Sequence, residues 1–210
     1  MQIDLPSEPA CSRQPHPSDR LPAQQAADPP RLALVRHPPV SGGAGLCYGR
    51  RNLPLARPGA DLPPLIARLA PLRGAQILAS PLSRCWEVAQ ALAQAWGGPA
   101  PVPEARLLEL DFGAWEGLPW AAIPRARLDA WAADLLGFAP PGGESGASLI
   151  ARISSLWAEI GAADTRFILI THGGPLKILT ALAEGQPVDL AAPAPPMGHV
   201  RIFTGPSKEA

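Results

Sequence analysis

The sequence contains few lysines, few cysteines and no long apolar run. Lys177 and Lys208 are its only lysines, and 18 basic side chains balance 18 acidic ones to a net charge of zero. Because general nucleic-acid and membrane-surface binders carry excess basic charge, this balance argues against both classes. No apolar stretch is long enough to cross a bilayer, and residues 1–20 lack the apolar run of a secretory signal. The three cysteines match no metal-binding spacing, so we expect a cytoplasmic protein without structural disulfides.

Proline and glycine, by contrast, are abundant, with 28 and 20 among 210 residues. Seven of the prolines fall in residues 1–30, which hold almost no apolar cluster. Such a segment cannot bury enough surface to offset the entropy lost when it becomes ordered. We therefore expect a mobile, Pro-rich tail at 1–30, one domain at 31–205 and a short C-terminal tail at 206–210.

Apolar runs alternate along the domain with amphipathic stretches. The runs predict buried strands at 32–35, 75–79, 167–170 and 200–203. The amphipathic stretches predict helices at 61–72, 80–96, 149–160 and 175–183, with a short helix at 125–136 inside an otherwise irregular segment, 104–147. Ser80 is the expected N-cap of the second of these helices. Strands alternating with helices predict the α/β class, a three-layer α/β/α sandwich with a mostly parallel sheet.

Residues suited to anion binding follow three of the predicted strands. In an open parallel sheet, ligands bind beyond the carboxyl ends of the strands. The segments at those ends bring Arg36, His37, Arg84 and His172 to one edge. Arginine forks, protonated histidine and helix N-termini all favour a dianionic phosphate. A single histidine at a strand end is more often structural, but three agreeing strand ends favour a phosphate site.

Four short motifs in this order resemble those of the histidine phosphatase superfamily, also called phosphoglycerate mutase-like. They are 36–37 (RH), 80–84 (SPLSR), 109–117 (ELDFGAWEG) and 171–173 (THG). The resemblance covers about residues 31–205. It implies the phosphoglycerate mutase-like fold and a phosphomonoesterase that needs neither a metal nor another cofactor.

The resemblance also implies roles for five residues. His37 would be the nucleophile, attacking phosphorus to give a phosphohistidine. Arg36, Arg84 and His172 would surround the transferring oxygens. Glu109 would be the general acid that protonates the leaving alkoxide and then the base that activates water. Glu116 is a competing candidate for this acid, and Asp111 is a weaker one.

The sequence departs from the family pattern after the nucleophile. Most members have glycine there, whereas this chain has Pro38. Proline has no N–H group, so any backbone donor to phosphate is lost at that position. The departure disfavours a mutase or a general sugar-phosphate phosphatase, and it is compatible with a catalytically weak protein that only binds phosphorylated ligands.

The segments 36–40, 45–50 and 53–55 resemble the α-ribazole phosphatase branch of the superfamily. That branch removes the 5′-phosphate from α-ribazole phosphate or from a phosphorylated corrinoid in cobalamin biosynthesis. The expected partner is therefore a small phosphorylated substrate. The alternatives are another small phosphoester, phosphoglycerate mutase activity, and a non-enzymatic phospho-ligand binder. The pattern does not indicate an oligomeric state.

Four further residues are candidates for substrate binding: Arg50, Tyr48, Gly173 and Glu144. Arg50 is suited to an extra phosphate or ribose contact, and a solvated loop arginine is an equally weighted alternative. Glu144 follows two glycines that allow close backbone approach. It is suited either to bind a ribose hydroxyl or to cap the following helix, and the cap is slightly favoured. Cys47 has no adjacent base, so we interpret it as a packing residue.

Overall fold

The apolar runs form a single five-stranded sheet in the computed structural model, which describes residues 31–204. The strand order is β3-β2-β4-β1-β5. Strands β1 to β4 pair in parallel and β5 runs antiparallel to β1. This confirms the predicted α/β class with a mostly parallel sheet. The strands are β1 Leu32–Arg36, β2 Gln76–Ala79, β3 Val102–Pro103, β4 Phe167–Thr171 and β5 Val200–Phe203.

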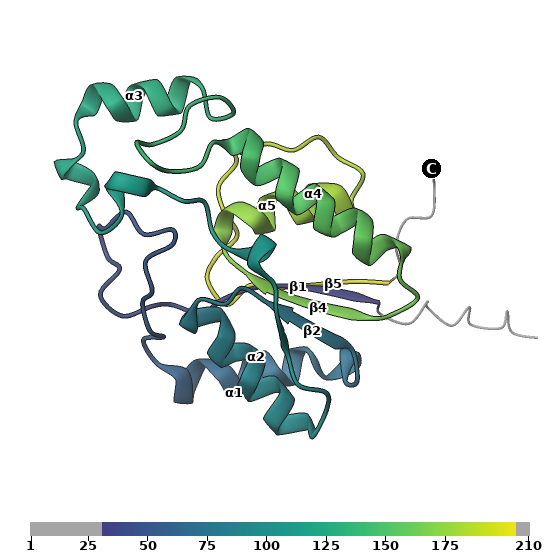
Figure 1. Cartoon of the computed structure of the whole chain (residues 1–210). Coiled ribbons are helices and arrows are strands. Elements are labelled where there is room, and N and C mark those ends of the chain that lie inside the picture. Colours follow the sequence, from purple (N-terminus) through teal and green to yellow (C-terminus); the bar gives the residue numbers. More distant parts are fainter. Residues whose placement is uncertain (1–30, 205–210) are drawn as a thin grey trace, which may run out of the picture.

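Helices cover both faces of the sheet, as Figure 1 shows. Helices α1 (Pro58–Arg68) and α2 (Ser83–Trp96) lie on one face. Helices α4 (Gly146–Ala162) and α5 (Gly173–Ala183) lie on the other. Helix α3 (Arg125–Ala133) lies away from both layers, beyond one end of the strands (Figure 1). None of the described helices is long and apolar enough to span a membrane.

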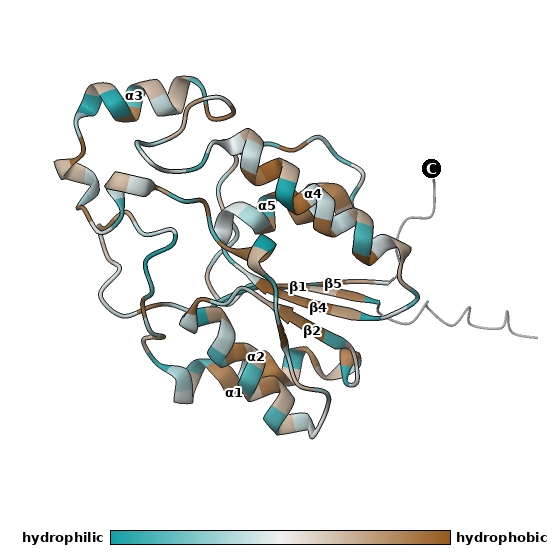
Figure 2. Cartoon of the chain, in the orientation of Figure 1, coloured by the Kyte–Doolittle hydropathy of each residue, from teal (hydrophilic) through white to brown (hydrophobic). Residues whose placement is uncertain are grey.

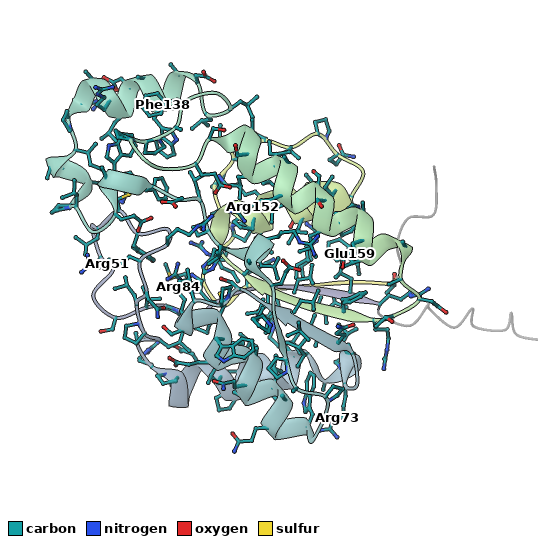
Figure 3. All side chains as sticks on the ribbon, viewed as in Figure 1. Arg51, Arg73, Arg84, Phe138, Arg152 and Glu159 are labelled. Atoms are coloured by element: carbon teal, nitrogen blue, oxygen red, sulfur yellow. The ribbon has the colours of Figure 1, made fainter. Side chains whose placement is uncertain are left out.

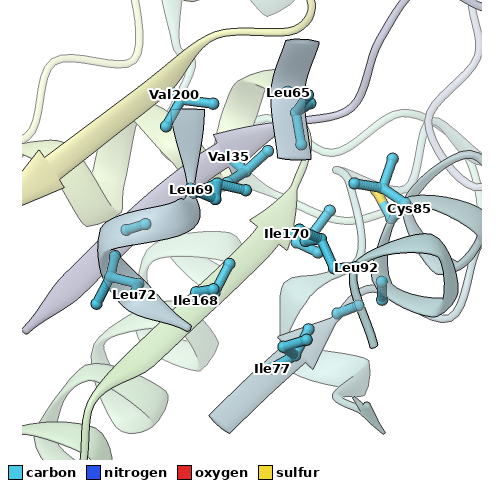
Figure 4. Packing of buried hydrophobic residues seen from close by; sticks show 14 of the residues in the cluster. Val35, Leu65, Leu69, Leu72, Ile77, Cys85, Leu92, Ile168, Ile170 and Val200 are labelled. Atoms are coloured by element: carbon cyan, nitrogen blue, oxygen red, sulfur yellow. The ribbon is translucent and has the colours of Figure 1, made fainter. Parts of the chain in front are cut away.

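Alternate residues of the strands supply two separate cores, because successive side chains of a strand point to opposite faces. Ala33 and Val35 of β1 pack with α1 and α2, whereas Leu34 packs with α4 and α5. Figure 2 shows the strands as mainly apolar, with hydrophilic residues near strand ends, as expected when helices cover both faces. Figure 4 shows the first core, where Val35, Ile77, Ile168 and Ile170 of the sheet meet helical leucines.

Much of the irregular segment 104–147 packs around aromatic side chains, while Leu107 and Leu110 join the core on the α4 and α5 face of the sheet. Besides α3, it contains three short 3₁₀ helices, Ala105–Leu107, Gly113–Trp115 and Trp120–Ala122. Buried Cys47 joins this cluster, which confirms its interpretation as a packing residue, and burial raises the pKa of its thiol to about 12. The aromatic members are Phe112, Trp115, Trp120, Trp131 and Phe138.

Several predicted boundaries differ from the structure. Ser80 is not an N-cap, because α2 begins at Ser83, whose backbone N–H donates to Asn52 Oδ1 at 2.8 Å. The predicted helix 61–72 divides into α1 and a 3₁₀ turn, Ala70–Leu72. Strand β3 was not predicted, since two exposed residues including a proline carry no strand periodicity. The predicted tails, 1–30 and 206–210, lie outside the described residues.

Candidate active site

The carboxyl ends of β1 and β4 bring two histidines together. Arg36 is the register partner of Thr171 in the parallel pair, so the residues that follow them, His37 and His172, are also neighbours. Their rings lie edge to face with centroids 5.2 Å apart. Both side chains are almost fully buried, at 2% and 0% exposed. The predicted convergence of these strand ends is therefore present in the fold.

The proton on the His37 ring is located by its neighbour. Its Nδ1 atom lies 2.7 Å from the carbonyl oxygen of Pro38. A carbonyl can only accept, so Nδ1 carries the proton and Nε2 keeps its lone pair. Burial, together with the positive charges of Arg84 and Arg36, lowers the pKa of His37 to about 3. His37 is therefore a neutral imidazole with a free Nε2 at neutral pH, which is the form that attacks phosphorus.

His172 belongs to a buried network that also contains Arg84 and Ser80. Arg84 Nε donates to His172 Nδ1 at 3.2 Å, which leaves the ring proton on Nε2. That nitrogen lies 2.7 Å from Ser80 Oγ. Burial lowers the pKa of His172 well below its usual value, so this ring is also neutral. The Ser80 hydroxyl is thus a buried partner of His172 and also lies 3.5 Å from the backbone N–H of Leu82, rather than capping α2.

A short loop, residues 49–51, is held between Arg84 and Glu116. Arg84 donates to the carbonyl oxygens of Gly49 at 2.7 Å and Arg51 at 2.8 Å. From the other side, the Glu116 carboxylate accepts the backbone N–H groups of all three loop residues and of Phe112, at 2.8–3.1 Å. Both carboxylate oxygens of Glu116 are thus engaged with the backbone, so Glu116 holds this loop in place. Figure 3 shows Arg51, Arg84 and Arg152 on the side toward α3, away from Arg73 and Glu159.

The carboxylate of Glu109 lies at the N-terminus of α5, close to the carboxyl ends of the strands. A general acid for a phosphate bound at those strand ends must lie there. Its carboxylate accepts the backbone N–H of Gly174 at 3.1 Å and of Leu110 at 3.0 Å. Its own carbonyl oxygen accepts hydrogen bonds from Arg50 Nε at 3.0 Å and Arg152 at 3.1 Å. Asp111, the weaker alternative, instead accepts the N–H of Gly113 at 2.8 Å.

Glu144 does not cap the helix that follows it, which was its favoured predicted role. Ser145, not Glu144, caps α4 by accepting the backbone N–H of Ser148. The Glu144 carboxylate pairs with Arg152 at 2.7 Å and lies 3.5 Å from Arg50. Glu144 therefore supports the arginines that hold the Glu109 segment. Arg152 was not predicted as a site residue. Its only signal in the sequence is a charged side chain within the amphipathic stretch 149–160.

A cavity of about 520 Å³ opens beside these groups. Its lining includes Arg36, Tyr48, Glu109, Gly173 and Gly174. The first four of these were predicted as catalytic or substrate-binding residues. Arg36 donates to the carbonyl oxygen of Pro195, but its buried Nε has no hydrogen-bond partner within residues 31–204. A buried guanidinium N–H group without a protein partner is a donor that an anionic oxygen would satisfy.

The same cavity contains residues that sequence reasoning did not single out. Lys177 donates to the carbonyl oxygens of Leu190 at 2.6 Å and Ala192 at 2.9 Å, and burial lowers its pKa. Trp131 of α3 and Leu149 of α4 also line the cavity. Among the described residues, no three His, Cys, Asp or Glu side chains gather so as to hold a metal ion.

Comparison with known proteins gives consistent matches. Residues 32–200 match the family model described as "Histidine phosphatase superfamily (branch 1)". The chain is 34% identical over 174 residues to a glucosyl-3-phosphoglycerate phosphatase of Mycolicibacterium vanbaalenii, with 76% of each protein covered. A solved mycobacterial glucosyl-3-phosphoglycerate phosphatase superposes with a TM-score of 0.68 at 27% identity, covering 82% of this chain and 89% of that one. A protein of Thermus thermophilus gives a TM-score of 0.62 at 27% identity, covering 82% and 92%.

Proposed function

The chain belongs to the histidine phosphatase superfamily, and on that premise we propose that it is a metal-independent phosphomonoesterase in which His37 is the nucleophile. The observation that carries the proposal is the contact of His37 Nδ1 with the Pro38 carbonyl oxygen at 2.7 Å. This contact leaves Nε2 unprotonated in a buried place beside the guanidinium groups of Arg36 and Arg84. The substrate is a small phosphorylated alcohol.

In the first half-reaction, His37 Nε2 forms a bond to phosphorus as the bond from phosphorus to the ester oxygen breaks. The leaving alkoxide takes a proton from the Glu109 carboxyl group. Arg36 supplies its unpaired Nε–H to a phosphoryl oxygen. Arg84 engages three of its five N–H groups within the protein and places its positive charge beside the His37 imidazole. These cations stabilise a transition state whose charge lies on the phosphoryl oxygens.

In the second half-reaction, the Glu109 carboxylate takes a proton from water as the water oxygen attacks phosphorus. The bond from phosphorus to Nε2 breaks, inorganic phosphate forms, and both His37 and Glu109 return to their starting states. His172 and Ser80 act through Arg84, because both ring nitrogens of His172 form hydrogen bonds within the protein. Charge stabilisation comes from arginine in this scheme, so no metal is required.

The leaving group has two named candidates. The α-ribazole phosphate or phosphorylated corrinoid expected from the sequence has no support in the names of the relatives. Glucosyl-3-phosphoglycerate is the ester named for the Mycolicibacterium relative. At 34% identity, that name supports the phosphoester class more firmly than the particular sugar acid. We therefore propose a phosphoester of a small alcohol as the class, and both compounds belong in the first assay.

The decisive experiment traps the phosphohistidine. The protein is mixed with ³²P-labelled p-nitrophenyl phosphate and quenched within milliseconds in alkaline detergent, where phosphohistidine is stable. We expect label that acid removes and alkali does not, in the wild type and in the His199→Asn control, but not in His37→Asn. Turnover in the presence of EDTA should be unchanged.

Four outcomes would contradict the proposal. Undiminished turnover in His37→Asn would show that His37 is not the nucleophile. Restoration of turnover in EDTA-treated protein by a divalent cation would show that the reaction requires a metal. Binding of phosphate without turnover at any pH would indicate the non-enzymatic phospho-ligand binder instead. Transfer of the label to 2- or 3-phosphoglycerate in preference to water would indicate a mutase.

A further inference from the structure

We propose that the cavity beside Arg36 and Glu109 selects phosphoesters whose alcohol has an apolar, aromatic-sized body, in preference to sugars and sugar acids. The inference deepens the proposed function and rests on it for the position of the phosphate. It concerns the part of the cavity that extends from the phosphate end toward α3, which we call the distal wall.

The distal wall is apolar over most of its extent. Its side chains come from four separate segments: the one after Glu109, helix α3 and its end, the start of α4, and the loop after α5. Its large members are Leu110, Phe112, Trp131, Leu135, Leu149 and Leu190. Burying apolar surface against such a wall is favourable in proportion to the area removed from water. A volume of about 520 Å³ is within the range of small-molecule sites.

The polar side chains of the cavity are few and are mostly engaged. They are Arg36, Tyr48, Glu109 and Lys177. Lys177 is engaged by the carbonyl oxygens of Leu190 and Ala192, and Glu109 accepts backbone N–H groups of Leu110 and Gly174. No serine, threonine, asparagine, glutamine or aspartate is among the lining residues. The hydroxyls of a sugar would thus lose water without gaining side-chain partners on the distal wall, which disfavours their binding.

The distal wall is also held in place. Trp131 lies 5.8 Å from Phe112 and 6.2 Å from Trp115 in edge-to-face contacts, and it stacks on Trp120 at 6.2 Å. Trp131 is only half-buried, so part of its ring remains free to line the cavity. A preformed aromatic surface binds an apolar group with little further ordering, which favours affinity.

The test uses three esters of primary alcohols, so that differences in leaving-group chemistry are small. They are 3-phenylpropyl phosphate, sn-glycerol 3-phosphate and glucose 6-phosphate. We expect kcat/KM for 3-phenylpropyl phosphate to exceed that of either polar ester by at least about tenfold, as burial of one phenyl ring would give. Equal values, or a preference for either polar ester, would overturn the inference while leaving the phosphatase proposal standing.

Two adjacent leucines provide matched variants. Leu135 lines the cavity, whereas Leu136 is 53% exposed and outside it. Leu135→Gln should lower the preference for 3-phenylpropyl phosphate over glycerol 3-phosphate by about fivefold or more, and Leu136→Gln should leave this ratio unchanged. Equal effects of the two substitutions would overturn the assignment of the distal wall.

Binding separates this inference from the proposed function. The non-hydrolysable 4-phenylbutylphosphonate and 3,4-dihydroxybutylphosphonate are compared by calorimetry on the wild type and on both leucine variants. Tighter binding of the phenyl compound, weakened by Leu135→Gln alone, supports the distal wall even where no ester is hydrolysed. Equal affinities would refute it, whatever the turnover.

Discussion

The Nδ1 atom of His37 lies 2.7 Å from the carbonyl oxygen of Pro38, the residue that follows it in the chain. Proline lacks an N–H group but keeps its carbonyl. The replacement of the usual glycine therefore removes a possible donor to phosphate, yet preserves the acceptor that sets the tautomer of the nucleophile. A proline at this position is consequently compatible with phosphohistidine chemistry.

Replacing Pro38 by alanine tests this separation. The carbonyl remains in Pro38→Ala, so we expect kcat to stay within about threefold of wild type. The free energy of unfolding should fall by about 0.4–1 kcal/mol, because alanine gives the unfolded chain more conformations. Steady-state kinetics and urea unfolding measure the two effects.

The control for this prediction is Pro39→Ala. Pro39 carries the same ring one residue later, and its carbonyl oxygen accepts the N–H of Ala56 at 2.8 Å instead. Its loss of stability should be similar and its kcat unchanged. A kcat loss above about tenfold in Pro38→Ala alone would mean that the ring, rather than the carbonyl, organises His37.

Much of the strand framework could be predicted from the sequence, since apolar runs such as 167–170 are bounded by polar residues. Their parallel arrangement then places Arg36, His37 and His172 at one edge without further information. The predicted Ser80 cap failed because α2 begins only at Ser83, and the Ser80 hydroxyl is instead a buried partner of His172. Propensity describes only local options, and a tertiary partner can outweigh them.

Residues whose roles depend on distant partners were not predictable. Glu144 belongs to a tertiary network with Arg152 and Arg50, and no local pattern pairs them. The aromatic cluster around Trp131 lies in a stretch that has no periodicity to indicate burial. The shape of the cavity depends on this stretch, so the leaving group could not be read from motifs.

The two buried histidines make stability depend on pH. Burial lowers the pKa of His37 to about 3, and that of His172 well below its usual value, whereas both titrate near 6.5 in the unfolded chain. Below pH 6.5 the unfolded state therefore binds protons that the folded state does not, and stability is lost as pH falls. The slope should approach about 1.4 kcal/mol per pH unit for each histidine.

Urea unfolding at about pH 7, 6 and 5 measures this slope. The range stays above the ordinary pKa of carboxyl groups, so the histidines dominate it. His37→Gln should reduce the dependence of the unfolding free energy on pH by the contribution of one histidine. Stability that is constant across this range would show that the rings are charged in the folded protein.

The assignment of Glu109 as the acid predicts a dependence on the leaving group. Glu109→Gln should lower kcat for an alkyl phosphate by about 10²–10⁴-fold, because the alkoxide then leaves without a proton. With p-nitrophenyl phosphate, whose leaving group is stable as an anion, the loss should be much smaller. Glu116→Gln is the matched control. It weakens the hold on residues 49–51, and should affect both substrates alike. A selective loss on alkyl phosphates in Glu116→Gln would exchange the two roles.

Arg84 combines a structural and an electrostatic role that lysine cannot reproduce. Its planar fork reaches Gly49, Arg51 and His172 at once, at 2.7–3.2 Å. A lysine ammonium is a single point charge on a flexible stem. Arg84→Lys should therefore leave at least one buried acceptor unpaired and reduce the free energy of unfolding by about 1–3 kcal/mol. It should also lower kcat by about 10²-fold or more, through misplaced charge at the phosphoryl group.

The exposed Arg73, at the opposite end of the sheet (Figure 3), provides the control, because Arg73→Lys makes the same substitution outside the site.

Addition of guanidinium ion should not restore the activity of Arg84→Lys, since the lysine side chain occupies the space. In a phosphate-binding measurement, Arg84→Lys should weaken affinity less than it lowers kcat, because the transition state carries more charge toward the arginine than the bound ester does. Equal losses in affinity and in kcat/KM, with kcat unchanged, would mean that Arg84 holds the substrate without assisting the chemical step.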